Sequence, residues 1–213
     1  MSEPEVSESE MRSGGDLLVD LLRRHQVDAA FGVVSVHNLP LVDAVDRRLR
    51  WVATRTEAGA LNAADGYARA TDGVGCAVTS TGTGAGNAAG ALVEALTAGS
   101  PVLHITGQID TPYLGRGLGV IHETRDQLPM LEAVSKTAST LTEDAATELS
   151  DLIAEALAYP RGPVSAEWPI DLQYADQPSL PAPTEPHRGA KPATPLDEAQ
   201  LAAAVELIKQ ARR

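Results

Sequence analysis

The stretch TRTEAGALNAADGYARA, residues 54–70, follows a short apolar segment, Trp51-Val52-Ala53, and decides how the chain is interpreted. The apolar segment indicates a strand, whereas the alanine-, leucine- and arginine-rich stretch after it favours a helix. Glu57 therefore stands where a strand gives way to a helix, which is the edge of an α/β sheet at which ligands bind. A purely structural explanation is also open, because an acid in the first turn of a helix is stabilised by the helix dipole.

Short apolar segments and helical patterns alternate along most of the chain. The segments predicted as strands are residues 27–31, 51–53, 73–79, 102–106, 133–138 and 164–171. This alternation predicts an α/β fold with a six-stranded parallel sheet and helices on both faces. On composition we expect a disordered acidic tail at 1–13, one domain at 14–175, a proline-rich linker at 176–195 and a C-terminal helix at 196–213.

A second feature is the glycine-rich segment STGTGAGN, residues 80–87, which directly follows a predicted strand. Glycines in a strand-to-helix turn allow close backbone approach and leave amide groups free at the start of the helix. The segment is neither a P-loop nor a dinucleotide fingerprint, because the Lys-Ser/Thr pair and the GxGxxG spacing are both missing. A tight turn that only packs a helix on the sheet would use the same glycines.

Three histidines occupy different kinds of position. His37 lies in the loop after the first strand, where it is either a general acid or base or a histidine that only hydrogen-bonds locally. His104 lies inside an apolar strand, which favours a core histidine with satisfied hydrogen bonds. His122 and Glu123 belong to the long irregular segment 111–125, and such long loops usually carry function or move.

Four segments together resemble the pyrimidine-binding, N-terminal domain of thiamine diphosphate enzymes. They are Phe31-Gly32 with Leu39-Pro40, Glu57-Ala58-Gly59-Ala60 with residues 64–70, residues 79–87, and residues 100–108. They occur in the order and at about the spacing of the family, over residues 14–172. The group that the chain resembles comprises acetolactate synthase-like proteins and 2-oxo acid decarboxylases.

The resemblance implies a role for each matching residue. Glu57 would be catalytic, as the carboxylate that activates the aminopyrimidine of thiamine diphosphate, with His37 as a second catalytic group. The implied cofactor-binding residues are Glu57, Gly82, Thr83, Gly84 and Asn87, and the implied substrate contacts are Ser35, His37, Gln108 and His122. The chain departs from the family at Val34-Ser35, where Pro-Gly is usual, and at Gly82-Thr83-Gly84, where Gly-Pro-Gly is usual.

The resemblance also implies a partner. The motif with which the family holds Mg²⁺ and the diphosphate is absent from these residues, so no metal ligand is assigned here. We expect a split enzyme acting on 2-oxo acids by decarboxylation or carboligation, in which another chain supplies the diphosphate and Mg²⁺ site. The alternatives are a truncated fragment of an acetolactate synthase-like enzyme and a non-catalytic binding or regulatory module. Self-association is expected, because the helix that contains Gly59 and Gly66 offers small residues for close packing.

Composition limits the other possibilities. The net charge of −12 argues against nucleic acid or an anionic membrane as a partner. No secretory signal and no apolar stretch of membrane length is recognised, so we expect a cytoplasmic protein. The single cysteine, Cys76, lies in an apolar run and is expected to be a buried, inert thiol.

Overall fold

The computed structural model describes residues 12–177, 180 and 197–212. Its centre is a six-stranded sheet in which every neighbouring pair is parallel. The strands are β1 (Ala29–Gly32), β2 (Arg50–Ala53), β3 (Gly75–Thr79), β4 (Val102–Gln108), β5 (Thr137–Thr140) and β6 (Val164–Pro169), in the order β2-β1-β3-β4-β6-β5. The predicted α/β fold with a six-stranded parallel sheet is confirmed.

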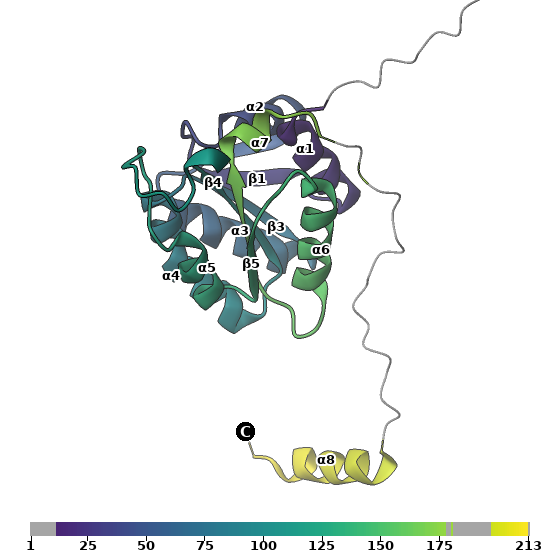
Figure 1. Cartoon of the computed structure of the whole chain (residues 1–213). Coiled ribbons are helices and arrows are strands. Elements are labelled where there is room, and N and C mark those ends of the chain that lie inside the picture. Colours follow the sequence, from purple (N-terminus) through teal and green to yellow (C-terminus); the bar gives the residue numbers. More distant parts are fainter. Residues whose placement is uncertain (1–11, 178–179, 181–196, 213) are drawn as a thin grey trace, which may run out of the picture.

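Helices cover both faces of the sheet, as predicted (Figure 1). One cluster of buried side chains comes from α1 (Gly14–Arg24), α2 (Leu39–Arg48) and α6 (Ala145–Leu157), together with the strands. A second cluster comes from α3 (Glu57–Thr71), α4 (Thr83–Ala98) and α5 (Gln127–Val134) on the opposite face. The central strands β3, β4 and β6 are buried along their whole length because both of their faces are covered.

The layer formed by α3, α4 and α5 is packed with small residues. Its buried members are mostly alanines, with Leu61, Leu92 and Leu131 as the larger fully buried side chains. Helix α3 approaches β3 so closely that a Cβ on Gly75 would lie 2.0 Å from the carbonyl oxygen of Ala64. Small side chains thus hold α3 and α4 near the sheet, with the N-terminus of each at its ligand edge.

Two predicted strands include residues that the structure assigns to helices. Residues 133–138 were expected as one strand, but α5 continues to Val134 and β5 begins only at Thr137. The helix persists because Leu131 is buried in the small-residue layer and Gln127 bonds to the glycine turn. Residues 164–171 were also expected as one strand, but β6 ends at Pro169 and a short helix, α7 (Ile170–Tyr174), follows.

The two ends of the domain lie side by side and are hydrogen-bonded to each other. Ser13 caps α1 through a capping box with Asp16, and Arg12 forms an isolated antiparallel bridge with Gln177. The expected acidic tail at 1–13 and linker at 176–195 otherwise fall outside the described residues. Helix α8 (Glu198–Gln210) begins at the N-cap Asp197 and has no buried residue.

Two buried groups behave as the sequence indicated. Burial raises the pKa of the Cys76 thiol to about 12, so it stays protonated near neutral pH. Burial lowers the pKa of His104 to about 3, and its ring nitrogens lie 2.9 Å from the Thr79 hydroxyl and 3.0 Å from the Ser165 hydroxyl. His104 is therefore a neutral core histidine.

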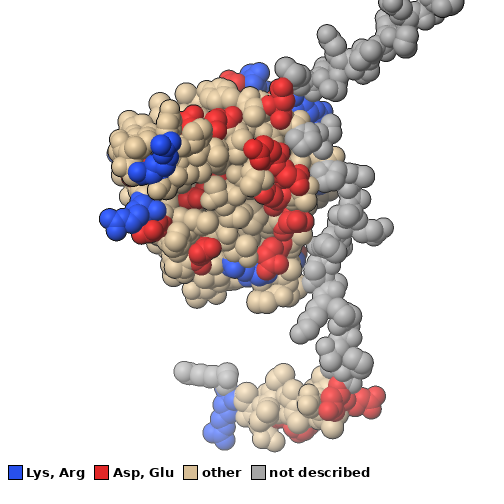
Figure 2. All heavy atoms as spheres, in the orientation of Figure 1, with Lys and Arg blue, Asp and Glu red and all other residues tan. Residues whose placement is uncertain are grey.

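Acidic side chains dominate one side of the surface. Figure 2 shows carboxylates gathered on the side where α6 lies, and α6 carries Glu148, Asp151 and Glu155. This distribution accounts for part of the negative charge seen in the sequence. None of the helices that the structure describes has the length and apolar character needed to cross a bilayer.

Candidate functional site

The candidate site lies where the strands end. Because all strands are parallel, the segments that leave their carboxyl ends meet at one edge of the sheet. The segments 33–38, 54–57, 80–87 and 108–126 follow β1, β2, β3 and β4 respectively. They bring together most of the residues that the sequence singled out.

Glu57 is the first residue of α3 and is half-buried. Thr56 caps the helix by accepting a hydrogen bond from the Gly59 amide at 3.1 Å, so the cap does not depend on Glu57. The Glu57 Oε2 atom accepts a hydrogen bond from Asn87 Nδ2 at 3.1 Å. In the part of the chain that the structure describes, Glu57 Oε1 has no hydrogen-bond partner, and it lies over the glycine turn.

The glycines of the turn are required by its geometry. Gly82 has φ +58° and ψ −103°, and a Cβ there would lie 2.1 Å from the carbonyl oxygen of His122. A Cβ on Gly84 would lie 2.8 Å from Ser80 Cβ and 3.2 Å from Glu57 Oε1. Thr83, exposed at the surface, starts α4 between them. Glycine at position 84 keeps a side chain away from the Glu57 carboxylate, and glycine at position 82 makes room for the His122 backbone.

The loop after β1 is fixed by Asn38, which is fully buried. Its side chain accepts from the Ser35 amide at 2.8 Å and donates to the carbonyls of Val33 at 3.0 Å and Thr79 at 3.1 Å. The Ser35 hydroxyl accepts from the His37 amide at 3.2 Å, so Ser35 closes a local turn. This network ties the loop to the end of β3 and fixes the position of His37.

His37 and His122 face each other across the site. Their ring centroids are 5.9 Å apart, and His122 Nδ1 lies 3.5 Å from the buried Ser80 hydroxyl. His37 is 5% exposed, and its buried Nδ1 has no hydrogen-bond partner among the residues that the structure describes. Burial, with a smaller contribution from the charge of His122, lowers the pKa of His37, although Asp110 opposes the shift. A neutral imidazole with a free nitrogen is suited to accept or donate a proton.

His122 is held in an uncommon backbone conformation, with φ +64°. Its carbonyl crosses directly over Gly82, as the close approach to that glycine shows. The long segment after β4 therefore folds back over the glycine turn. It contacts the predicted site residues through His122 and Thr124.

A buried polar network adjoins the glycine turn. Gln127 Oε1 accepts hydrogen bonds from the Gly82 amide and from the Thr81 hydroxyl, the latter at 2.9 Å. Gln127 Nε2 and Gln108 Nε2 both donate to Glu167 Oε1, at 2.8 and 3.2 Å. Gln108 also accepts from Thr81 and from the amide of Ile109, so protein groups occupy both ends of its side chain.

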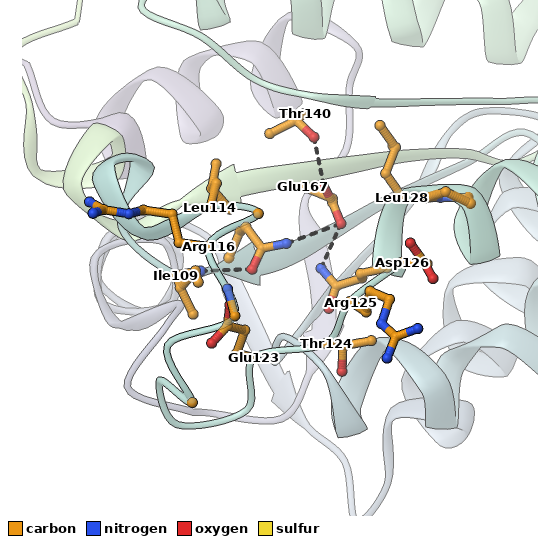
Figure 3. A pocket seen from close by; sticks show the side chains of 16 residues that line it. Ile109, Leu114, Arg116, Glu123, Thr124, Arg125, Asp126, Leu128, Thr140 and Glu167 are labelled. Atoms are coloured by element: carbon orange, nitrogen blue, oxygen red, sulfur yellow. Dashed lines mark hydrogen bonds between the residues drawn. The ribbon is translucent and has the colours of Figure 1, made fainter.

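This network lines a cleft of about 770 Å³ (Figure 3). The cleft lies between the segment 114–129 and the ends of β4, β5 and β6. Gln108, Glu123, Gln127, Thr140 and Glu167 line it, whereas Glu57, His37 and His122 do not. The candidate site thus has two parts, the Glu57 and histidine side and the cleft, joined at Thr81-Gly82.

Sequence reasoning missed several of these residues. Ser80, Asn38, Gln127 and Glu167 were not singled out, although Glu167 gave a signal as an acid inside an apolar strand. Within the described residues, no group of three or more histidine, cysteine, aspartate or glutamate side chains is arranged to hold a metal ion.

Comparisons with known proteins agree with this geometry. The profile of the family described as thiamine pyrophosphate enzyme, N-terminal TPP binding domain, matches residues 12–130. The chain is 36% identical over 94% of its length to a probable 2-ketoarginine decarboxylase of Pseudomonas aeruginosa, covering 36% of that protein. It is 34% identical over 79% of its length to 2-hydroxyacyl-CoA lyase 2 of Mus musculus, covering 27% of that protein.

A solved structure shares the fold. The thiamine diphosphate-dependent 4-hydroxybenzoylformate decarboxylase of Rhodococcus jostii RHA1 superposes with a TM-score of 0.75 at 25% identity, over 95% of this chain and 38% of that one. The chain spans about a third of the length of the curated relatives that it matches: 36%, 34% and 36% of the length of three of them. Fold, motifs and relatives agree, and the chain belongs to the thiamine pyrophosphate enzyme family, of which it carries the N-terminal TPP-binding domain.

Proposed function

We propose that this chain provides the aminopyrimidine-binding half of a thiamine diphosphate site in an enzyme that acts on 2-oxo acids. The observation that carries the proposal is the arrangement of Glu57, Asn87 and Gly84. One carboxylate oxygen is held by Asn87, the other is free, and glycine leaves the space beside it open. We place this domain at residues 14–175.

The residues present fit an aminopyrimidine. Its ring nitrogens and amino group need a carboxylate to share a proton, which Glu57 offers. The ring also needs backbone that it can approach closely, which Gly82 and Gly84 offer on either side of Thr83 at the start of α4. When bound, thiamine diphosphate supplies the electron sink for cleavage or formation of a bond next to a carbonyl. The role of Glu57 is to hold a proton at Oε1, while Asn87 keeps the carboxylate turned toward the glycine turn.

The two histidines, His37 and His122, are proposed to contact the substrate. His37 has a free, buried Nδ1 and His122 lies opposite it, so the pair can exchange protons with a substrate held between the loops. Ser35 acts by shaping the His37 loop. Gln108 acts through the cleft that it lines, since its amide is already bonded to protein groups.

The diphosphate and Mg²⁺ half of the site is proposed to lie outside these residues, on a partner chain or on further sequence. The relatives are about three times as long as the matched region, and the described residues contain no candidate metal cluster. A divalent ion that bridges diphosphate needs oxygen ligands, which the other part must provide. A non-catalytic module with this fold is the alternative outcome of the experiment below.

Self-association is proposed through α3 and α4. Gly66, Gly86 and Gly90 lie in these helices, and no described residue comes within 4 Å of an added Cβ, so packing within the described part of the chain does not explain them. Glycine inside a helix costs about 1 kcal/mol relative to alanine. Val93 and Leu96, 46% and 37% exposed, lie on the same helix α4. Sedimentation velocity should show a dimer or larger species that Gly90→Arg shifts toward monomer.

The function is tested by turnover of 2-oxo acids in the assembled enzyme, formed with a polypeptide that carries the diphosphate-binding domain. Glu57→Gln should lower turnover by at least about 100-fold, as expected for loss of a proton-transferring group. Glu132→Gln, an exposed acid on α5, is the matched control and should leave turnover unchanged. Retained turnover in Glu57→Gln, with an unchanged circular dichroism spectrum, would contradict the proposed role.

A further inference from the structure

Glu167 is a buried carboxylate without a cationic partner. It lies on β6 and is 3% exposed. Its oxygens accept three hydrogen bonds from neutral groups, two from Gln108 and Gln127 and one from the Thr140 hydroxyl at 2.6 Å. No lysine, arginine or histidine among the described residues forms an ion pair with it. A buried charge is ordinarily paired, because its removal from water is costly.

The surroundings do not supply the missing cation. Arg116 and Arg125 line the same cleft, but Figure 3 shows both guanidinium groups turned away from Glu167. Arg116 donates to the Pro112 carbonyl, and Arg125 is exposed. The carboxylate of Glu123, also in the cleft, is occupied by the backbone amides of Gly117 and Val120. Glu167 is therefore the carboxylate at the inner end of the cleft that remains electrostatically uncompensated.

The cleft can admit a small organic group. Its volume of about 770 Å³ lies within the range of small-molecule sites. Among the described residues Thr140 is the one donor to Oε2 of Glu167, and a carboxylate oxygen accepts two hydrogen bonds. A planar guanidinium or an ammonium group could thus reach Oε2 from the cleft. A cation there would gain a charge-assisted hydrogen bond in a partly desolvated place.

We propose that this cleft is a binding site for a small organic cation, an alkylguanidinium or alkylammonium group, with Glu167 as its recognition residue. The site adjoins the glycine turn through Gln127, which bonds to both Glu167 and Gly82. In an enzyme for 2-oxo acids the cleft would select acids with a positively charged end. That extension rests on the proposed function, whereas cation binding by the chain does not.

The test is calorimetric titration of the chain with butylguanidinium and with butylurea, its neutral analogue of the same shape. The unchanged protein should bind butylguanidinium saturably and at least about tenfold more tightly than butylurea, the effect of one charge-assisted hydrogen bond. Pentanoate, which carries a carboxylate on the same butyl chain, should bind no better than butylurea. Equal affinity for the three probes, preference for the anion, or no saturable binding would overturn the proposal without using any variant.

Two variants locate the charge. In Glu167→Gln the new amide oxygen can still accept hydrogen bonds from the Gln108 and Gln127 amides. The new NH2 group can donate to the Thr140 hydroxyl, which donates to the carboxylate in the unchanged protein, so the fold should be retained. This variant should abolish the preference for butylguanidinium over butylurea. Glu132→Gln, which removes an exposed carboxylate on α5 that does not line the cleft, should keep that preference. Preference retained in Glu167→Gln would show that Glu167 is not the recognition residue.

The two sets of experiments distinguish an error in the proposed cation site from an error in the proposed function. Loss of cation preference in the chain alone leaves the Glu57 experiment unaffected, because Glu57 does not line the cleft. If cation binding holds and the assembled enzyme shows no turnover of any 2-oxo acid, the proposed function is wrong and the binding site stands.

Discussion

Replacement of Gly82 by alanine tests whether the glycine turn and the His122 segment are in contact. Gly82 has φ +58° and ψ −103°, a sparsely populated conformation outside the αL region that costs an L-residue about 1–3 kcal/mol. The new Cβ would lie 2.1 Å from the His122 carbonyl oxygen, which must retreat by about 1.3 Å to reach ordinary contact at 3.4 Å. Overpacking of this kind costs about 1–3 kcal/mol, so the two terms together predict a loss of about 2–6 kcal/mol in the free energy of unfolding.

Gly117→Ala separates the cost of placing an alanine at positive φ from the cost of the steric clash with the His122 carbonyl. Gly117 has φ +61°, but no described residue lies within 4 Å of its added Cβ, so only the conformational cost of about 1–2 kcal/mol applies. Urea denaturation followed by circular dichroism gives both values. In thermal unfolding, Gly82→Ala should melt about 10 °C lower than the unchanged protein, and Gly117→Ala only about 3 °C lower. Equal losses in the two variants would mean that the His122 backbone does not lie over Gly82.

Three further predictions concern the core, the loop after β1 and acid stability. Leu92→Ala should lower the free energy of unfolding by about 2–5 kcal/mol in urea titrations, because this fully buried side chain fills the layer of α3, α4 and α5. Asn38→Ala should cost about 2–3 kcal/mol and expose residues 33–38 to limited proteolysis, since it leaves the buried carbonyl of Thr79 without its donor; unchanged cleavage would contradict this. His104 has its pKa lowered to about 3, so the unfolded chain binds a proton there below pH 6.5 and the folded protein does not. Its contribution to stability is therefore lost as pH falls from 6.5 to about 3, by about 1.4 kcal/mol per pH unit, and urea titrations of His104→Asn at pH 4.5–7 should show a correspondingly flatter dependence.

Local chemistry made part of the site predictable. Glu57 was identified because a strand composition changes to a helix composition just before it, and Gly82 and Gly84 because glycine is required in a tight strand-to-helix turn. Asn87 was identified by resemblance alone. The structure brings these residues together, whereas their roles in cofactor binding stay predictions.

The strand boundaries near α5 could not be predicted from local pattern. Residues 133–138 have the composition of a strand, but Leu131 and Gln127 extend the helix by contacts with α4 and with the glycine turn. Tertiary contacts override local propensity at such short elements. The same contacts fix the orientation of the Gln127 amide, which no sequence pattern indicates.

The sequence alone determined the order of strands and helices, the placement of Glu57 at the ligand edge and the family resemblance, because each depends on neighbouring residues. Only the tertiary structure decided which distant groups meet. Asn87 reaches Glu57 across 30 positions, Gln127 reaches Gly82 across 45, and Gln108 reaches Glu167 across 59. These pairs follow from the parallel sheet order β2-β1-β3-β4-β6, which brings the ends of strands that are far apart in the chain to one edge. The uncompensated charge of Glu167 is likewise a property of the packed fold, since it depends on what surrounds the side chain in space.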